Sequence, residues 1–231
     1  MKTLKTLCIG VLAAGMLLTG CNSMTNTGKG ALIGGGGGAA LGAGIGALIG
    51  GGKGAGIGSA IGAAVGAGAG TLIGNRMDKQ AKQLEQQLQD AQVEQVQDQN
   101  GLAAIKVTFP GGILFPTNGT TLSAGAQTEL AQFANSLIQN PETNVQVYGF
   151  TDNTGSLAAN TKVANGRALA VDRFLIDSGV SPTRVTYQGV PMANYVASND
   201  TAAGRAQNRR VEIYITASQQ MIQQAEAGTL R

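Results

Sequence analysis

A glycine recurs at every fourth position through the N-terminal part of this chain, and the repeat limits what that part can form. The twelve positions run from Gly30 to Gly74 without a break, with small and apolar residues between them. In a helix, residues four apart share one face, and glycine there lets two backbones approach closely. Residues 31–52 and 54–74 are each long enough, at about 1.5 Å per residue, to cross a hydrocarbon core. The repeat therefore predicts a helical glycine zipper over residues 30–74.

A flexible linker is the alternative for this segment. Glycine costs about 1 kcal/mol per residue relative to alanine in a helix, so the repeat cannot hold itself together in water. A linker, however, has no use for the large apolar side chains between the glycines, which include Leu32, Ile33, Leu41, Ile45 and Ile57. These side chains need a lipid or protein surface. The segment is expected to insert in a membrane or to self-associate, and the sequence leaves that choice open.

The first twenty residues have the pattern of a secretory signal peptide. Lys2 and Lys5 form a basic start, and Leu7–Leu18 is an apolar stretch too short to span a bilayer. Leu18-Thr19-Gly20-Cys21 follows and resembles the bacterial lipobox, in which the cysteine becomes a lipid-modified N-terminus. We therefore predict that residues 1–20 are removed, with an ordinary cleaved signal as the alternative.

The cysteine content supports lipidation at Cys21. Cys8 leaves with the signal, so Cys21 is the remaining cysteine, and an unpaired thiol in an oxidising compartment needs an explanation. Each methylene of an acyl chain contributes about 0.8 kcal/mol when it is buried in a membrane, so several acyl chains would anchor the protein firmly. Asn22 in place of aspartate resembles the outer-membrane-sorted kind of lipoprotein. Residues 21–29 are then a lipidated N-terminus and linker.

Composition argues against several classes of function. Histidine is absent, which removes the Ser-His-Asp triad, histidine-ligated zinc and the usual neutral-pH general base. Loss of Lys2 and Lys5 leaves 14 basic and 13 acidic side chains, so the net charge falls from +3 to +1. The chain has no basic tail and few aromatic residues, so its composition does not suggest nucleic-acid binding. We predict a non-enzymatic protein with no catalytic residues, metal or cofactor.

The character of the chain changes to polar over residues 75–100. Apolar residues with a 4-3-4-3 spacing mark one seam on this polar stretch: Met77, Ala81, Leu84, Leu88 and Ala91. The pattern predicts a polar helix, either a solvated spacer or a short coiled coil, that holds the next domain away from the membrane. Asn100-Gly101 is predicted to end it.

Residues 101–217 alternate between strand and helix patterns. Strands are predicted at 103–109, 145–149, 184–188 and 211–216, where apolar residues alternate or cluster. Helices are predicted from Ser123 to Asn140 and through Val163–Leu175 to Gly179. The fold class is α+β, a βαβαββ α/β sandwich with one core, and residues 218–231 are expected to be a polar tail.

Three separated blocks give this domain a family resemblance. They are Thr151-Asp152-Asn153-Thr154-Gly155 with Asn160 after it, then Arg167-Ala168, then Gly204–Ile213 with Asn208-Arg209-Arg210 inside it. In this order and spacing, over residues 101–217, they resemble the peptidoglycan-binding OmpA-like C-terminal domain. The order of lipobox, glycine zipper, short helix and this domain resembles that of YiaD-type lipoproteins.

The resemblance implies a ligand and residue roles. The ligand is diaminopimelate in peptidoglycan stem peptides, whose side chain ends in one ammonium and one carboxylate on the same carbon. Asp152 is expected to bind the ammonium and Arg167 the carboxylate, because the arginine fork can bind a carboxylate in bidentate fashion. By position, Asn118 matches a loop residue that hydrogen-bonds the ligand. The alternative is that Asp152 and Arg167 form only an internal salt bridge in a turn.

Other residues of these blocks are expected to support the site. Thr151, Thr154 and Asn160 fall where the binding loop and the following helix start are shaped. Of Arg209 and Arg210, one is expected to line the site and the other to brace the sheet, without a choice between them.

The sequence as a whole predicts an outer-membrane lipoprotein that binds peptidoglycan noncovalently and tethers the membrane to the cell wall, with its C-terminal domain in the periplasm of a Gram-negative bacterium. Self-association through the glycine zipper is a further expected contact, and nucleic acid is not an expected partner. The alternative is a membrane-active or self-assembling zipper protein whose domain only localises it. A wall hydrolase would need paired carboxylates or a nucleophile–base pair, which the sequence does not suggest.

Overall fold

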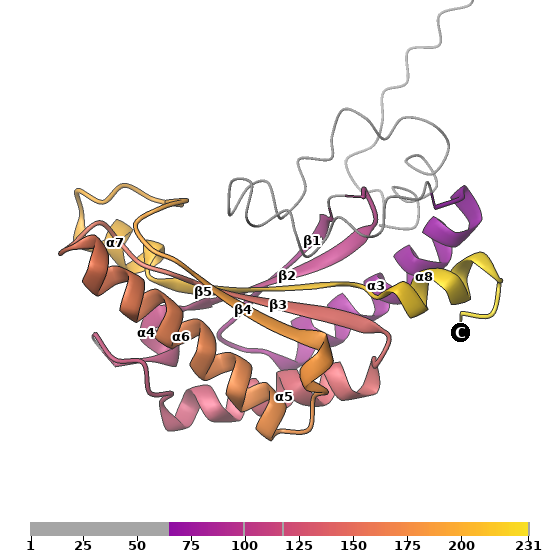
Figure 1. Cartoon of the computed structure of the whole chain (residues 1–231), viewed down its shortest axis with the longest axis horizontal. Coiled ribbons are helices and arrows are strands. Elements are labelled where there is room, and N and C mark those ends of the chain that lie inside the picture. The colour runs from indigo at the N-terminus through magenta and orange to yellow at the C-terminus, as the bar shows by residue number, and fades with distance from the viewer. Residues whose placement is uncertain (1–64, 99, 117, 231) are drawn as a thin grey trace, which may run out of the picture.

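One mixed sheet of five strands organises the residues that the structure describes (Figure 1). The structure is a computed structural model and describes residues 65–98, 100–116 and 118–230. The strand order is β1-β2-β5-β3-β4. The pair β3/β4 is parallel, and β1/β2, β2/β5 and β3/β5 are antiparallel. The strands are β1 Gln92–Gln97, β2 Ala103–Pro110, β3 Thr143–Phe150, β4 Val185–Val190 and β5 Arg210–Ala217.

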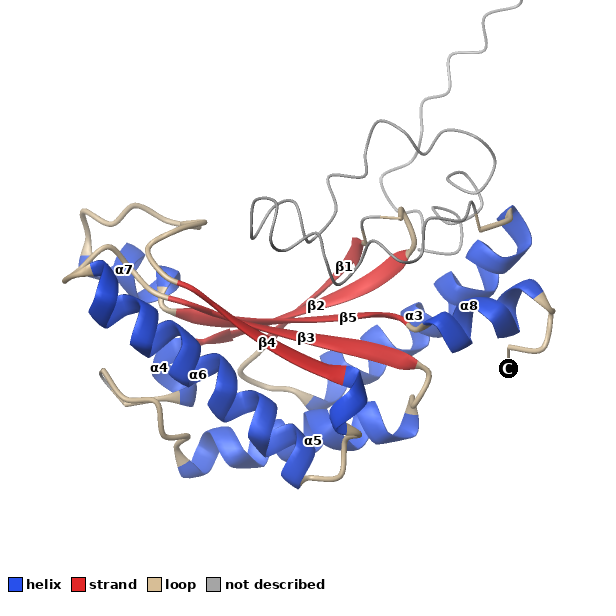
Figure 2. Cartoon of the chain, viewed as in Figure 1, coloured by secondary structure: helices blue, strands red, loops and turns tan. Residues whose placement is uncertain are grey.

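Helices cover one face of this sheet and flank its ends (Figure 2). They are α3 Ala67–Gln87, α4 Gly111–Leu114, α5 Ala124–Gln139, α6 Leu157–Asp177, α7 Ala202–Asn208 and α8 Gln219–Glu226, with a 3-10 helix at Pro182–Arg184. The helices α5 and α6 confirm the two predicted from the sequence. Ser123 caps α5 as predicted, because its hydroxyl accepts a hydrogen bond from the amide of Ala126 at 3.1 Å.

The core lies between the helices and the alternate residues of β2, β3 and β5. Direct partners across these strands are apolar: Ile105 faces Ile215, and Val107 faces Ile213, which faces Val147 in turn. All of these side chains are fully buried. Phe109 packs edge-on against Phe133 of α5, with ring centroids 6.1 Å apart. The alternation predicted for residues 103–109 and 211–216 is therefore confirmed.

The polar segment 75–100 does not form the predicted spacer. Its helix, α3, ends at Gln87, and Gln92–Gln97 form the edge strand β1, paired with β2. Met77, Ala81 and Leu84 of the predicted seam are fully buried. They pack against the core of this domain and not in a separate coiled coil. The prediction was wrong because β1 is stabilised by backbone pairing with β2, and a polar sequence gives no local pattern that predicts such pairing. Asn100-Gly101 belongs to the β1–β2 turn, with Gly101 at φ 74°.

The C-terminal residues also differ from the prediction. Residues 219–226 form α8, whose Met221, Ile222 and Ala225 are buried, and α8 packs against α3. The expected polar tail is therefore a docked helix. Within the described residues, the structure contains no helix with the length and hydropathy needed to cross a bilayer.

Several predictions concern residues outside those described. These are the signal peptide, lipidation of Cys21, the linker 21–29 and the glycine zipper up to residue 64. The last turns of the glycine repeat do fall inside α3, where Gly70 and Gly74 are buried. The boundary predicted at residue 74 therefore lies inside one continuous helix.

Candidate functional site

The loop that follows β3 is fixed by its own side chains. The Asp152 carboxylate accepts a hydrogen bond from the amide of Thr154 at 2.9 Å, which closes a tight turn. The buried Asn160 side chain donates to the carbonyls of Thr154 at 2.8 Å and Ser156 at 3.1 Å. The hydroxyl of Thr151 accepts from the amide of Met192 at 3.0 Å. Thr151, Thr154 and Asn160 thus hold the shape of the loop, and a role of this loop in ligand binding stays a prediction.

Asp152 is paired with Arg209 and not with Arg167. Its Oδ2 lies 2.6 Å from Nη1 of Arg209; the aspartate side chain is 9% exposed and the arginine side chain 39%. Burial would raise the pKa of Asp152, but the Thr154 amide and the Arg209 guanidinium outweigh burial and hold that pKa below its ordinary value. Asp152 is therefore ionised at neutral pH. The alternative of an internal salt bridge is realised with a different arginine from the one the sequence suggested.

Arg167 lies buried on α6, with 3% of the residue exposed. Its Nε donates to the carbonyl of Gly119 at 3.0 Å, and its guanidinium carbon lies 5.3 Å from the centre of the Phe115 ring. Burial lowers the pKa of Arg167, the positive charge of Arg209 lowers it further, and the negative charge of Asp152 raises it. The three charges therefore act on one another in a single site.

Two glycines bring α6, and Arg167 with it, close to the sheet. Gly149 of β3 and Gly189 of β4 are direct partners in the parallel pair. A Cβ atom on Gly149 would lie 2.4 Å from the carbonyl oxygen of Ala164, and one on Gly189 would lie 2.5 Å from the amide nitrogen of Asn165. Any side chain at either position would push the helix away. The close crossing places Arg167 over the C-terminal end of β3, from which Asp152 emerges.

Asn118 lies in the loop that holds Arg167. It is exposed and has φ 57°, a left-handed conformation that asparagine tolerates better than most residues. Its neighbour Gly119 accepts the hydrogen bond from Arg167. Asn118 is therefore the neighbour of the residue that binds Arg167, and Asn118 itself is exposed to solvent.

Arg209 and Arg210 have different partners in the structure. Arg209 reaches Asp152 at the site. The Arg210 side chain lies on the sheet face opposite the helices, bonded to Glu212 at 2.6 Å and stacked 3.9 Å above the Phe150 ring centre. Alternate residues of a strand point to opposite faces, but sequence alone did not say which of two adjacent arginines began the strand.

Asn208, just before these arginines, organises a second loop. Its Oδ1 accepts from the amides of Val196 and Ala197, and its Nδ2 donates to the carbonyl of Ala197 and to Oδ1 of Asn199. Asn199 in turn accepts from the amide of Asn153 at 3.3 Å. The loop at residues 196–199 is thereby tied to the loop of Asp152.

This arrangement suits a ligand that carries both charges. Two guanidinium groups and one carboxylate meet at one end of the sheet, so the site can offer an anion to an ammonium and a planar donor fork to a carboxylate. Arg167 uses Nε for the carbonyl of Gly119, and its two terminal nitrogens form no hydrogen bond to another described residue. Among the described residues, no group of three or more His, Cys, Asp or Glu side chains is arranged to hold a metal ion.

This domain is similar to the OmpA family. Residues 114–209 match that family. Residues 1–78 match the YMGG-like Gly-zipper family, so the chain is similar to one family over its N-terminal part and to the other over its C-terminal part. Both parts of the resemblance drawn from the sequence are thereby confirmed.

Individual proteins agree with this assignment. The chain is 39% identical over 112 residues to the probable lipoprotein YiaD of Escherichia coli strain K12, covering 48% of this chain and 51% of YiaD. It is 36% identical over 113 residues to the peptidoglycan-binding protein ArfA of Mycobacterium tuberculosis strain H37Rv, covering 49% of this chain and 35% of ArfA. The match thus spans about half or less of these relatives.

A solved structure supports the fold. The cell wall anchor of the T6SS from Pseudomonas aeruginosa superposes with a TM-score of 0.51 at 29% identity, covering 62% of this chain and 96% of that one. The predicted α/β sandwich is therefore confirmed, with the added strand β1 and the helices α3 and α8.

Proposed function

We propose that this protein binds the diaminopimelate of peptidoglycan stem peptides and tethers the outer membrane to the cell wall. The observation that carries the proposal is the meeting of Asp152, Arg167 and Arg209 at one end of the sheet, in a domain that matches the OmpA family. The free end of the diaminopimelate side chain is a zwitterion, with the ammonium and carboxylate on one carbon.

Each half of that zwitterion has a partner. The ammonium approaches Asp152, whose lowered pKa keeps it ionised and whose oxygens retain lone pairs beyond those used by Thr154 and Arg209. The carboxylate approaches the terminal nitrogens of Arg167. Asn118 adds a neutral hydrogen bond from the rim. Because Arg209 shares Asp152, the site keeps a surplus positive charge that favours the ligand carboxylate.

The tether requires an anchor at the other end of the chain. Cys21 within the lipobox is the proposed attachment point for acyl chains, and the outer membrane is the proposed location, with the domain in the periplasm. The names of the relatives support this, since YiaD is called a probable lipoprotein and ArfA a peptidoglycan-binding protein. Neither name denotes an enzyme, and we propose that binding is noncovalent, without catalysis.

A competition experiment tests the proposal. The mature chain, purified in detergent, is incubated with purified sacculi, and bound protein is measured after sedimentation. Free meso-diaminopimelate should release the bound protein at a lower concentration than 1,5-diaminopentane, which has the same two ammonium groups but neither carboxylate. Equal release by the two compounds, or no binding to sacculi, would contradict the proposed ligand.

A further inference from the structure

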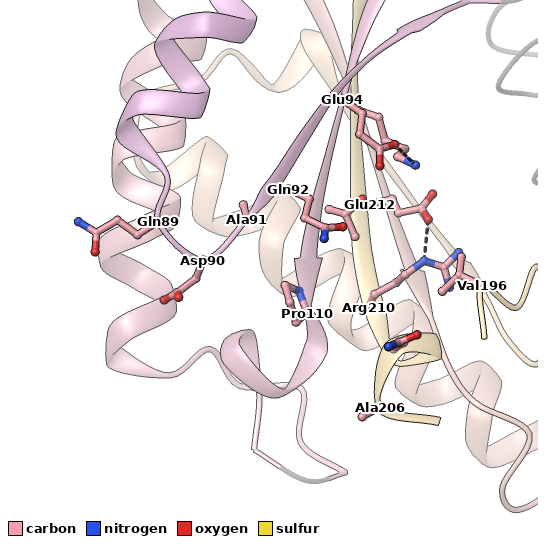
Figure 3. A pocket seen from close by; sticks show the side chains of 13 residues that line it. Gln89, Asp90, Ala91, Gln92, Glu94, Pro110, Val196, Ala206, Arg210 and Glu212 are labelled. Atoms are coloured by element: carbon pink, nitrogen blue, oxygen red, sulfur yellow. Dashed lines mark hydrogen bonds and ion pairs between the residues drawn. The ribbon is translucent and has the colours of Figure 1, made fainter. Parts of the chain in front are cut away.

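A cavity of about 770 Å³ lies on the sheet face opposite the core helices (Figure 3). Its floor is formed by β1, β2 and β5, and its walls by the turn after α3 and by α7 with the preceding loop. This volume is within the range of small-molecule sites, roughly 300–1,000 Å³. No part of the site around Asp152 lines it.

The floor of the cavity is one continuous row across three strands. Gln92 of β1 is the direct partner of Thr108, and Thr108 is the direct partner of Glu212. Neighbouring strands lie about 4.8 Å apart, so the row presents polar groups at regular intervals over roughly 10 Å. Such a row suits an extended ligand with repeated polar groups better than a compact one.

The charges in the cavity are already paired with one another. Arg210 donates Nε to Glu212 at 2.6 Å, and its two terminal nitrogens donate to the carbonyls of Asn208 and Asn194. The other oxygen of Glu212 accepts from the hydroxyl of Tyr214 at 2.7 Å. Glu94 and Lys106 form a second ion pair across β1 and β2. The Arg210–Glu212 pair is buried and disfavours a charged ligand, whereas the Glu94–Lys106 pair is partly exposed.

What remains for a ligand is neutral or mildly acidic. Within the described part of the chain, the side-chain amides of Gln92 and Gln207 and the hydroxyl of Thr108 bond to no protein group. Asp90, at the rim, has no ion-pair partner among those residues, so it disfavours anions and can accept from hydroxyl groups. Amides and hydroxyls both donate and accept, as the groups of an N-acetylated sugar do.

The cavity and the candidate site lie on either side of one short segment. Gln207 and Arg210 line the cavity, while Arg209, between them in the chain, reaches Asp152. Peptidoglycan has two matching parts, because charged stem peptides branch from a neutral glycan strand. A ligand with both parts is able to place its peptide at Arg209 and its sugars beside Arg210.

We infer that this cavity is a second subsite, which binds the neutral N-acetylated glycan strand of peptidoglycan. The inference rests on the proposed function, because it is peptidoglycan bound at Asp152 that brings a glycan to this face. Occupation of both subsites by one ligand raises affinity through the high effective concentration of the second part. Acidic small molecules are not expected ligands of the cavity, because Asp90 lies at its rim.

Calorimetric titration of the mature chain in detergent with chitotetraose, a peptide-free oligomer of N-acetylglucosamine, tests this subsite. The parent should bind saturably. Thr108→Val and Gln207→Ala should each weaken binding about fivefold, the effect of one lost neutral hydrogen bond. Gln132→Ala, a change of an exposed glutamine on α5, is the matched control and should leave binding unchanged. No saturable binding, or equal effects of Gln132→Ala and Gln207→Ala, would overturn the subsite.

A second variant separates this inference from the proposed function. Asp152→Asn should leave the affinity for chitotetraose unchanged while it weakens binding of diaminopimelate. If chitotetraose binds and responds to Gln207→Ala but diaminopimelate does not compete for sacculi, the glycan subsite stands and the peptide site fails. If diaminopimelate competes and chitotetraose does not bind, the peptide site stands and the glycan subsite is overturned.

Discussion

Replacement of Asp152 by asparagine removes one charge from the site and almost no volume. The asparagine oxygen still accepts from the Thr154 amide, a bond of 2.9 Å in the structure, so the turn is kept. What is lost is the 2.6 Å ion pair with Arg209, whose side chain is 39% exposed. A pair of this exposure is screened by water, and we expect its loss to cost about 1 kcal/mol of folding free energy. For a domain of this size, the melting temperature should then fall by about 2–4 °C.

The expected loss of ligand binding is larger. Truncation of one partner of a buried, charge-assisted pair costs about 2–5 kcal/mol, which corresponds to a loss of roughly 30-fold or more. The affinity is measured from sacculus-binding isotherms of the full chain in detergent. Asp177→Asn is the matched control, because it removes an exposed carboxylate near the C-terminus of α6. The control should bind within twofold of the parent.

The pH dependence gives the same prediction a second measurement. Because the pKa of Asp152 in the folded protein lies below its ordinary value of 3.8, the ionised carboxylate stabilises the fold above that value. This stabilisation is lost only as the pH falls through the lowered pKa, so it should be constant between about pH 5 and 8. Asp152→Asn should remove that acid-range dependence. Sacculus binding within threefold of the parent, or a fall in melting temperature above about 8 °C, would refute the reasoning, since Asp152 would then be dispensable or purely structural.

Further substitutions probe the rest of the chain. Arg167→Lys keeps the charge but loses the planar fork, so we expect sacculus affinity to fall about tenfold in the same isotherms, and parental affinity would contradict bidentate binding. Gly149→Ala should displace α6 and weaken binding together with thermal stability, measured by calorimetry; unchanged values of both would contradict the close crossing. A fragment of residues 101–231 should fail to unfold cooperatively by circular dichroism whereas 65–231 does, because α3 contributes several fully buried side chains, each about 1.5–3 kcal/mol; equal stability of the two would show that α3 and β1 are dispensable. Cys21→Ala should prevent recovery of the mature protein from the outer-membrane fraction, and normal recovery would rule out the lipobox.

Local sequence patterns predicted most of the central domain. The alternation of Ile105, Val107 and Phe109 identified a strand and its buried face, because alternate residues of a strand point to opposite faces. Ser123 identified the start of α5, since a serine hydroxyl satisfies a free amide of the first turn. Asp152 and Arg167 were identified from the sequence blocks that resemble the OmpA-like domain, and the structure brings both to the same end of the sheet.

Features that depend on a partner distant in sequence were not predicted. The strand β1 has a polar sequence that fits a solvated helix equally well, and its pairing with β2 decides between the two. Met77, Ala81 and Leu84 of the predicted apolar seam do lie on one buried face of α3, whereas Leu88 and Ala91 lie beyond its end. Periodicity does not identify the surface that covers this face, which is the domain itself and α8.

The partner of Asp152 was the other undetermined feature. Sequence alone determined that a charged loop and two adjacent arginines exist, because residue type and spacing are local properties. Only the tertiary structure decided that Arg209 reaches Asp152 while Arg210 turns to the opposite face and Arg167 binds Gly119. The physical reason is that an ion pair depends on distances of a few ångströms between side chains, and the packing of α6 on Gly149 and the register of β5 fix those distances.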